Sequence, residues 1–371
     1  MAVMMGHVRG LFFVDFPFIA HPPSAILKSL YAVTGFGHQA VIVFFVLSGY
    51  FIGTSVSEQI AARRWSWRTY LINRLTRLQL VLIPALLLGA LWDQLGMRLP
   101  QAASFYFGGL YKYYPPSVAL RSTVPVFLGN LFFLQSVTAP VFGSNGPLWS
   151  LSYEFWYYIL FPVVMLAAAS WVDYRGRFVY LGLALLLLWF VGPQIAIYFL
   201  IWLLGTLMGR LRATHWPKSR AGGGLASLMA SLPFALALAW VRIHPEISEM
   251  RGDLMIGACF ALWIFALIQG RRGDVAVGYA KTSRTLAGFS YTLYLTHFPL
   301  LLLLRGLLNP AGNWQPDAQH LLYGIALALA MLSFAYLLAQ FTETRTALVR
   351  NRVMQWTAPA VNKGAKKEVA E

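Results

Sequence analysis

Glu154 is an acidic residue inside a long apolar segment. It lies in the run PLWSLSYEFWYY, which continues into ILFPVVM and predicts a single membrane-embedded helix. A carboxylate below the membrane surface is costly and persists mainly where it pairs, titrates or lines a wet cavity. Glu154 is therefore a candidate acid–base group.

Two histidines are predicted to lie at a similar depth. At 1.5 Å per residue, His7 lies about 10 Å, Glu154 about 9 Å and His297 about 13 Å from the outer ends of their predicted spans. An imidazole beside a carboxylate is a general-base unit, because the carboxylate fixes the tautomer and stabilises the imidazolium. We expect His7 and Glu154 to be catalytic and His297 to line the substrate site. The alternative is that both histidines are interior residues bonded to the backbone.

Arg74 and Arg77 are three residues apart, so they share one face at the start of a predicted helix. Such a fork of guanidinium groups suits phosphate. The pair is therefore a candidate anion site, and the alternative is a topology anchor or a contact with lipid headgroups.

Composition defines the setting of these residues. Of 371 residues, 58% are hydrophobic and 11% charged, and the mean hydropathy is +0.61. Soluble domains carry about 25% charged residues, so the chain is predicted to be an all-α, polytopic membrane helix bundle. About ten transmembrane helices are expected, at about 1–14, 35–56, 71–95, 147–170, 178–192, 194–211, 225–242, 253–269, 284–306 and 318–341. Two of them meet at Gly192–Pro193, where a re-entrant pair is expected.

The charge pattern orients the bundle. The net charge is +16, and most Lys and Arg residues fall in the connections on the side of the termini. This bias places both termini in the cytoplasm and explains the basic balance without nucleic acid. The single cysteine, Cys259, excludes an intramolecular disulfide, and the histidines lack metal-ligand spacing, so no metal is expected.

Three further features concern the ends and the packing. The first span is short, with about 14 residues before Asp15, and we expect a native N-terminus further upstream. A transmembrane domain is predicted over 1–345, and a basic, disordered cytoplasmic tail over 346–371. Small-residue patterns at Gly49/Gly53 and Gly205/Gly209 predict close helix packing.

The chain resembles the acyltransferase 3 family of integral membrane proteins over nearly its whole length. The resemblance rests on five pieces in order: GHVR at 6–9, GHQAVIVFFVLSGY at 37–50, NRLTR at 73–77, WSLSYE at 149–154 and FSYTLYLTH at 289–297. They are similar, in turn, to the end of the family's first helix, its second-helix signature, its arginine-x-x-arginine, its tryptophan-serine-leucine-x-x-glutamate and its late-helix motif. The arginine of the family's first helix would fall before Met1.

The resemblance implies an enzyme that O-acylates saccharides. The donor would be cytoplasmic acyl-CoA, most often acetyl-CoA, and Arg74 and Arg77 would bind its phosphates. His7, oriented by Glu154, would deprotonate a hydroxyl of an extracytoplasmic or lipid-linked saccharide such as lipopolysaccharide or exopolysaccharide. A narrow channel would thread the pantetheine arm between them, and its expected walls are Ser48, Tyr50 and Tyr153.

Several points stay open at this stage. A secondary transporter or flippase without acyl transfer is the alternative function. The acceptor, the acyl group and a covalent acyl-histidine variant are undecided. Membrane lipids, further copies of the chain and polysaccharide-assembly machinery are the expected partners. The expected location is the bacterial inner membrane.

Overall fold

The computed structural model describes residues 1–107, 117–213, 223–244, 246–269, 277–310 and 312–357. Every named element in these ranges is helical. The first half contains α1 (Ala2–Phe12), α2 (Ala25–Val33), α3 (Gly37–Ser48), the π-helix η2 (Gly49–Gly53), α4 (Thr54–Ala61), α5 (Trp67–Arg98), α6 (Ala103–Phe107), α7 (Val118–Arg121), α8 (Val124–Leu131) and α9 (Trp149–Ala168). The second half contains α10 (Tyr174–Ala213), α11 (Gly223–Ile243), α12 (Glu249–Gln269), α13 (Val277–Ala287), α14 (Ser290–Leu308), α15 (Ala318–Ala339) and α16 (Thr346–Trp356), and 3₁₀ turns occur at Phe16–Phe18, Gly146–Leu148 and Glu343–Arg345.

Seven helical stretches in the described residues are long and apolar enough to cross a membrane. They are Gly37–Ala61, Trp67–Arg98, Gly146–Ala168, Tyr174–Leu211, Glu249–Gln269, Ser290–Leu308 and Ala318–Trp356. The all-helical membrane fold is therefore confirmed. Each of the ten predicted ranges contains a helix, but α1 has 11 residues and the apolar part of α11 is Leu228–Ile243. The count of ten spans and the cytoplasmic termini stay predictions.

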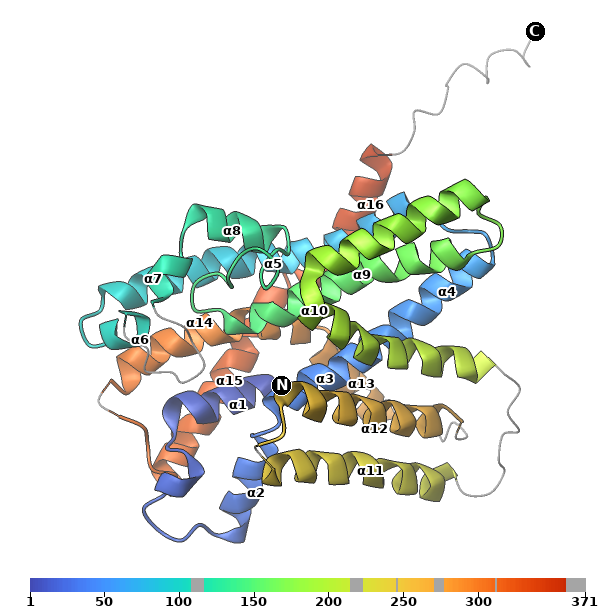
Figure 1. Ribbon diagram of the computed structural model, residues 1–371. Helices are drawn as coiled ribbons and strands as arrows, with labels where there is room; N and C mark the ends of the chain where they lie inside the picture. The colour runs from blue at the N-terminus through green and yellow to red at the C-terminus, as the bar shows by residue number, and fades with distance from the viewer. Residues whose placement is uncertain (108–116, 214–222, 245, 270–276, 311, 358–371) are drawn as a thin grey trace.

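Helix α10 is two helical segments joined at a sharp bend. Gly192 has φ 80° and ψ 169°, a conformation that a residue with a Cβ rarely adopts. Pro193 follows and lacks the backbone N–H that a continuous helix needs. Figure 1 shows the two arms of α10 as a V. The Gly192–Pro193 pair thus divides this segment where the sequence predicts.

The two small-residue patterns pack against each other where η2 and α4 meet the second arm of α10. A Cβ at each glycine would overlap an atom of the other segment: Gly49 with the carbonyl oxygen of Trp202, Gly205 with that of Val46, Gly53 with the Thr206 side chain and Gly209 with the Thr54 hydroxyl. We call this contact the glycine seam. It confirms the prediction of close packing and brings two backbones together.

Buried side chains form two clusters. One lies among α3, α5, α9, α10 and α12 and contains several aromatic rings, including Tyr157 and Trp202. The other is built from α1, α14 and α15 around Phe12 and Leu301.

The start of the predicted disordered tail is helical. Helix α16 covers Thr346–Trp356, and the Arg68 guanidinium donates to the carbonyl of Met354 at 2.7 Å and to the Thr357 hydroxyl at 2.9 Å. The prediction of disorder was therefore wrong for this part, because Arg68 of α5 anchors the end of α16. Residues 358–371 lie outside the described residues.

Candidate active site

His7 on α1 pairs with His297 on α14. Nδ1 of His7 lies 2.8 Å from Nε2 of His297, and the two rings lie edge to edge, with their planes 14° apart and their centroids 5.0 Å apart. Phe298 packs edge-on against His7 at 4.8 Å. His297 itself is almost fully buried.

The backbone fixes the protonation pattern of this pair. Nδ1 of His297 lies 2.9 Å from the carbonyl oxygens of both Leu293 and Tyr294. A carbonyl only accepts, so Nδ1 of His297 carries a proton and, in the neutral ring, Nε2 accepts. The Nδ1–H of His7 then donates to Nε2 of His297. This leaves Nε2 of His7 with a lone pair that can take a proton from a ligand.

Glu154 lies elsewhere than the sequence predicts. The hydroxyl of Tyr158, one turn further along α9, donates to Oε1 of Glu154. Arg77 and Arg74 are the cationic side chains that interact electrostatically with Glu154. The structure therefore corrects the expected contact: His7 takes its orientation from His297, and Glu154 belongs to the arginine pair of α5.

The two arginines have different surroundings. The Arg74 guanidinium lies 5.5 Å from the ring centroid of Tyr70 and 5.4 Å from that of Tyr158. Arg77 is exposed and lines a cavity together with Glu154. Arg74 and Arg77 place two guanidinium groups beside Glu154, and Glu343 also interacts electrostatically with Arg77. Guanidinium groups suit an anionic ligand.

Two cavities carry the predicted polar residues. The His7 cavity has a volume of about 630 Å³ and is lined from α1, α3, α7, α9, α12 and α14, from residues 34–35 and from the segment 136–147. Its polar side chains include His7, Arg9, His38, Arg121 and Glu249. The Arg77 cavity has a volume of about 220 Å³ and contains Arg77, Glu154, Ser150 and Ser290.

The two cavities share part of their walls. Val3, Val41 and Tyr294 line both of them. The Tyr294 hydroxyl donates to the carbonyl of Pro147 at 3.0 Å and lies 2.7 Å from the Ser150 hydroxyl. Tyr294 is thus fixed at the junction between the histidine pair and the arginine pair.

The expected channel residues line neither cavity. Ser48 is buried in the glycine seam, where it accepts from the Trp202 indole N–H at 3.2 Å. Tyr153 stacks on Phe45 with centroids 6.1 Å apart, and Tyr50 packs against Phe51 at 5.0 Å. Ser48 also contacts Tyr158, the partner of Glu154, whereas Tyr50 and Tyr153 contact neighbouring aromatic rings. Tyr294 lines both cavities.

Sequence reasoning missed His38, which lines the His7 cavity and pairs with Asp253 on α12. Its Nε2 lies 2.7 Å from Oδ2 of Asp253. His38 is part of the second-helix signature, but its partner is 215 positions away. A histidine at the start of an apolar helix is the only signal that the sequence offers for this site.

The fold and these cavities define a multi-pass membrane protein with a buried polar site. A family model described as an acyltransferase domain matches residues 1–340, so the chain belongs to the acyltransferase 3 family. No curated protein and no solved structure matches significantly. The family match confirms the resemblance and defines the chain as a membrane acyltransferase.

Proposed function

We propose that the protein transfers an acyl group, such as acetyl, from cytoplasmic acyl-CoA to a hydroxyl of an extracytoplasmic or lipid-linked saccharide. The single observation that carries this proposal is the shared wall of the two cavities. A group held at Arg77 can extend toward His7 past Tyr294. A secondary transporter would not need a cationic cavity that adjoins a cavity with a general base.

The donor occupies the Arg77 cavity in this proposal. Arg77 and Arg74 bind CoA phosphates, and Glu154 holds the two guanidinium groups in place. With both termini in the cytoplasm, this end faces the cytoplasmic pool of acyl-CoA. The pantetheine arm then points the thioester toward the His7 cavity.

The acceptor enters the His7 cavity. Its hydroxyl proton passes to Nε2 of His7 while the hydroxyl oxygen attacks the thioester carbonyl. The C–S bond breaks as the tetrahedral intermediate collapses, and the CoA thiolate takes the proton from His7. Throughout the reaction, His297 accepts a hydrogen bond from Nδ1–H of His7. This contact keeps Nε2 of His7 directed at the ligand.

The test uses the purified protein in lipid nanodiscs with radiolabelled acetyl-CoA. The acceptor is surface glycan of the producing cells, stripped of its esters by mild alkali. We expect label to enter the glycan and free thiol to appear in equal amount. No transfer by the wild-type protein with acetyl-, succinyl- or longer acyl-CoA would overturn the proposed function.

A further inference from the structure

A histidine–aspartate pair lies at the His7 cavity, with its histidine on the cavity wall. His38 at the start of α3 and Glu249 at the start of α12 line this cavity, and Asp253 lies one turn after Glu249. Nε2 of His38 lies 2.7 Å from Oδ2 of Asp253 and 3.3 Å from Oε1 of Glu249. The mechanism above uses none of these groups.

Asp253 holds His38 in one orientation. Its side chain is only 3% exposed, and its Oδ2 also accepts from the Tyr198 hydroxyl at 2.6 Å. With Oδ2 of Asp253 as the acceptor of this contact, Nε2 of His38 carries the proton and its Nδ1 is the atom left for a ligand. The His38 ring also stacks on Trp149 with centroids 5.8 Å apart.

Exposure separates the three polar side chains by role. The His38 side chain is 29% exposed and that of Glu249 is 74% exposed, whereas Asp253 is closed off. The imidazole and the Glu249 carboxylate can therefore both reach a ligand in the cavity. Together they offer acceptors, and a donor when His38 is charged, beside Trp149, which also lines the cavity.

We propose that His38, held by Asp253, and Glu249 form the subsite that binds the acceptor saccharide in the His7 cavity. This inference rests on the proposed function. A sugar presents neighbouring hydroxyls that are both donors and acceptors. His38 and Glu249 bind the hydroxyls next to the reacting one, and His7 on α1 removes the proton of the reacting one.

A divalent cation is the competing occupant. The ligand atoms of His38, Glu249 and Asp253 lie within 4.8 Å of one another. However, Nε2 of His38 and Oδ2 of Asp253 are hydrogen-bonded to each other, and Oδ2 also accepts a hydrogen bond from Tyr198. The atoms that would face a cation are thus already used, which favours the hydrogen-bonded pair.

The experiment measures initial transfer rates while the concentration of ester-free glycan is varied at saturating acetyl-CoA. We expect His38→Ala and Asp253→Asn to raise the acceptor KM on the order of tenfold and to change kcat less than about threefold. The KM for acetyl-CoA stays at the wild-type value. Glu249→Gln, at an exposed side chain whose loss does not threaten folding, raises the acceptor KM in the same way.

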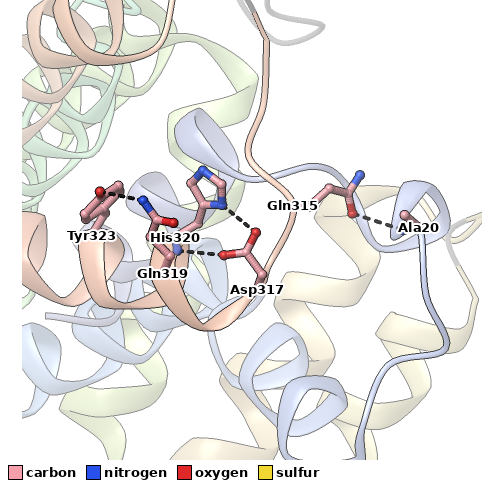
Figure 2. Close-up of polar contacts among 6 residues, drawn as sticks. All are labelled: Ala20, Gln315, Asp317, Gln319, His320 and Tyr323. Carbon is pink, nitrogen blue, oxygen red and sulfur yellow. Dashed lines mark hydrogen bonds and ion pairs between the residues drawn. The ribbon is translucent and has the colours of Figure 1, made fainter.

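A matched control pair is available at the start of α15. Nδ1 of His320 lies 2.7 Å from Oδ2 of Asp317, a bond shown in Figure 2. The backbone N–H of His320 also donates to Asp317 and lowers the pKa of that carboxyl. Both pairs thus join a histidine ring nitrogen to an aspartate oxygen at 2.7 Å. Neither residue lines the His7 or Arg77 cavity, and His320→Ala should leave both KM values unchanged.

Three outcomes would overturn the subsite. One is an unchanged acceptor KM in folded His38→Ala and Glu249→Gln proteins that transfer label. Another is an equal loss of kcat and of kcat/KM for the glycan, which would make His38 a second base. The third is loss of transfer after EDTA treatment that Mn²⁺ restores only in the wild type. A wild-type protein without transfer would instead count against the proposed function.

Discussion

His7 and His297 are 290 positions apart in the chain, yet their rings lie edge to edge and share a hydrogen bond of 2.8 Å. The pair joins α1 to α14 and gives each ring a defined tautomer. It makes His297 a positioning residue, because His297 acts on the ligand through His7.

Substitution of the pair should separate the two roles. His7→Ala removes the proposed base, and we expect kcat to fall by about 10²- to 10⁴-fold. His297→Ala should cost less, about tenfold to a hundredfold, because the base remains but loses its fixed orientation. His297→Gln offers an acceptor amide oxygen and should recover part of the rate. Equal kcat in His297→Ala and wild type would show that the pair is structural only.

The arginine pair should respond to the phosphates of the donor. Arg77→Gln should raise the KM for acetyl-CoA about tenfold, since a charge-assisted hydrogen bond is lost. The matched comparison uses S-acetyl-pantetheine, which lacks the nucleotide phosphates. The variant and the wild type should use this short donor equally well. A similar loss with both donors would make Arg77 a structural residue or a contact with lipid.

Glu154 should behave as a partner of the arginines. We expect Glu154→Gln to raise the KM for acetyl-CoA and to leave the pH dependence of kcat unchanged, because His7 has another partner. In the double variant with Arg77→Gln the two effects should be non-additive by at least about 0.5 kcal/mol. A shift in the pH profile of kcat would instead support the contact between Glu154 and His7 that the sequence predicts.

The glycine seam should be intolerant of a methyl group. Gly49→Ala and Gly205→Ala place a Cβ on the backbone of the opposite segment. Overpacking of this kind costs about 1–3 kcal/mol, so both variants should lose thermal stability in detergent. Gly182→Ala is the control, because it lies in the first arm of α10 with no atom within 4 Å of the added Cβ. It should be neutral or slightly stabilising.

Much of the fold follows from local properties of the chain. Runs of apolar residues predict where the helices lie, and the Gly192–Pro193 pair predicts the bend in α10. The small-residue patterns at Gly49 and Gly205 predict a tight contact, although they do not say that the two patterns meet each other. These features depend on residues that are close together in the sequence, so a single amino-acid sequence is enough to predict them.

The partners in the site could not be derived in the same way. Depth along a helix axis gives the height of a side chain but not its direction around that axis. His7 and Glu154 are at similar estimated depths, yet one faces α14 and the other faces α5. In addition, α5 begins at Trp67, so Arg77 lies ten residues, about 15 Å, along it and lines the same cavity as Glu154. His38 and Asp253 meet only because α3 and α12 start side by side.

The glycine seam also makes one part of the bundle rigid. Two backbones in direct contact cannot slide past each other without a clash, so η2, α4 and the second arm of α10 form one stiff panel. Helix α1, with only 11 residues, carries His7 in the cavity wall, to which this panel contributes no residue. Tilting of α1 to admit a bulky glycan would therefore leave the panel in place, and each such tilt would break and remake the histidine contact.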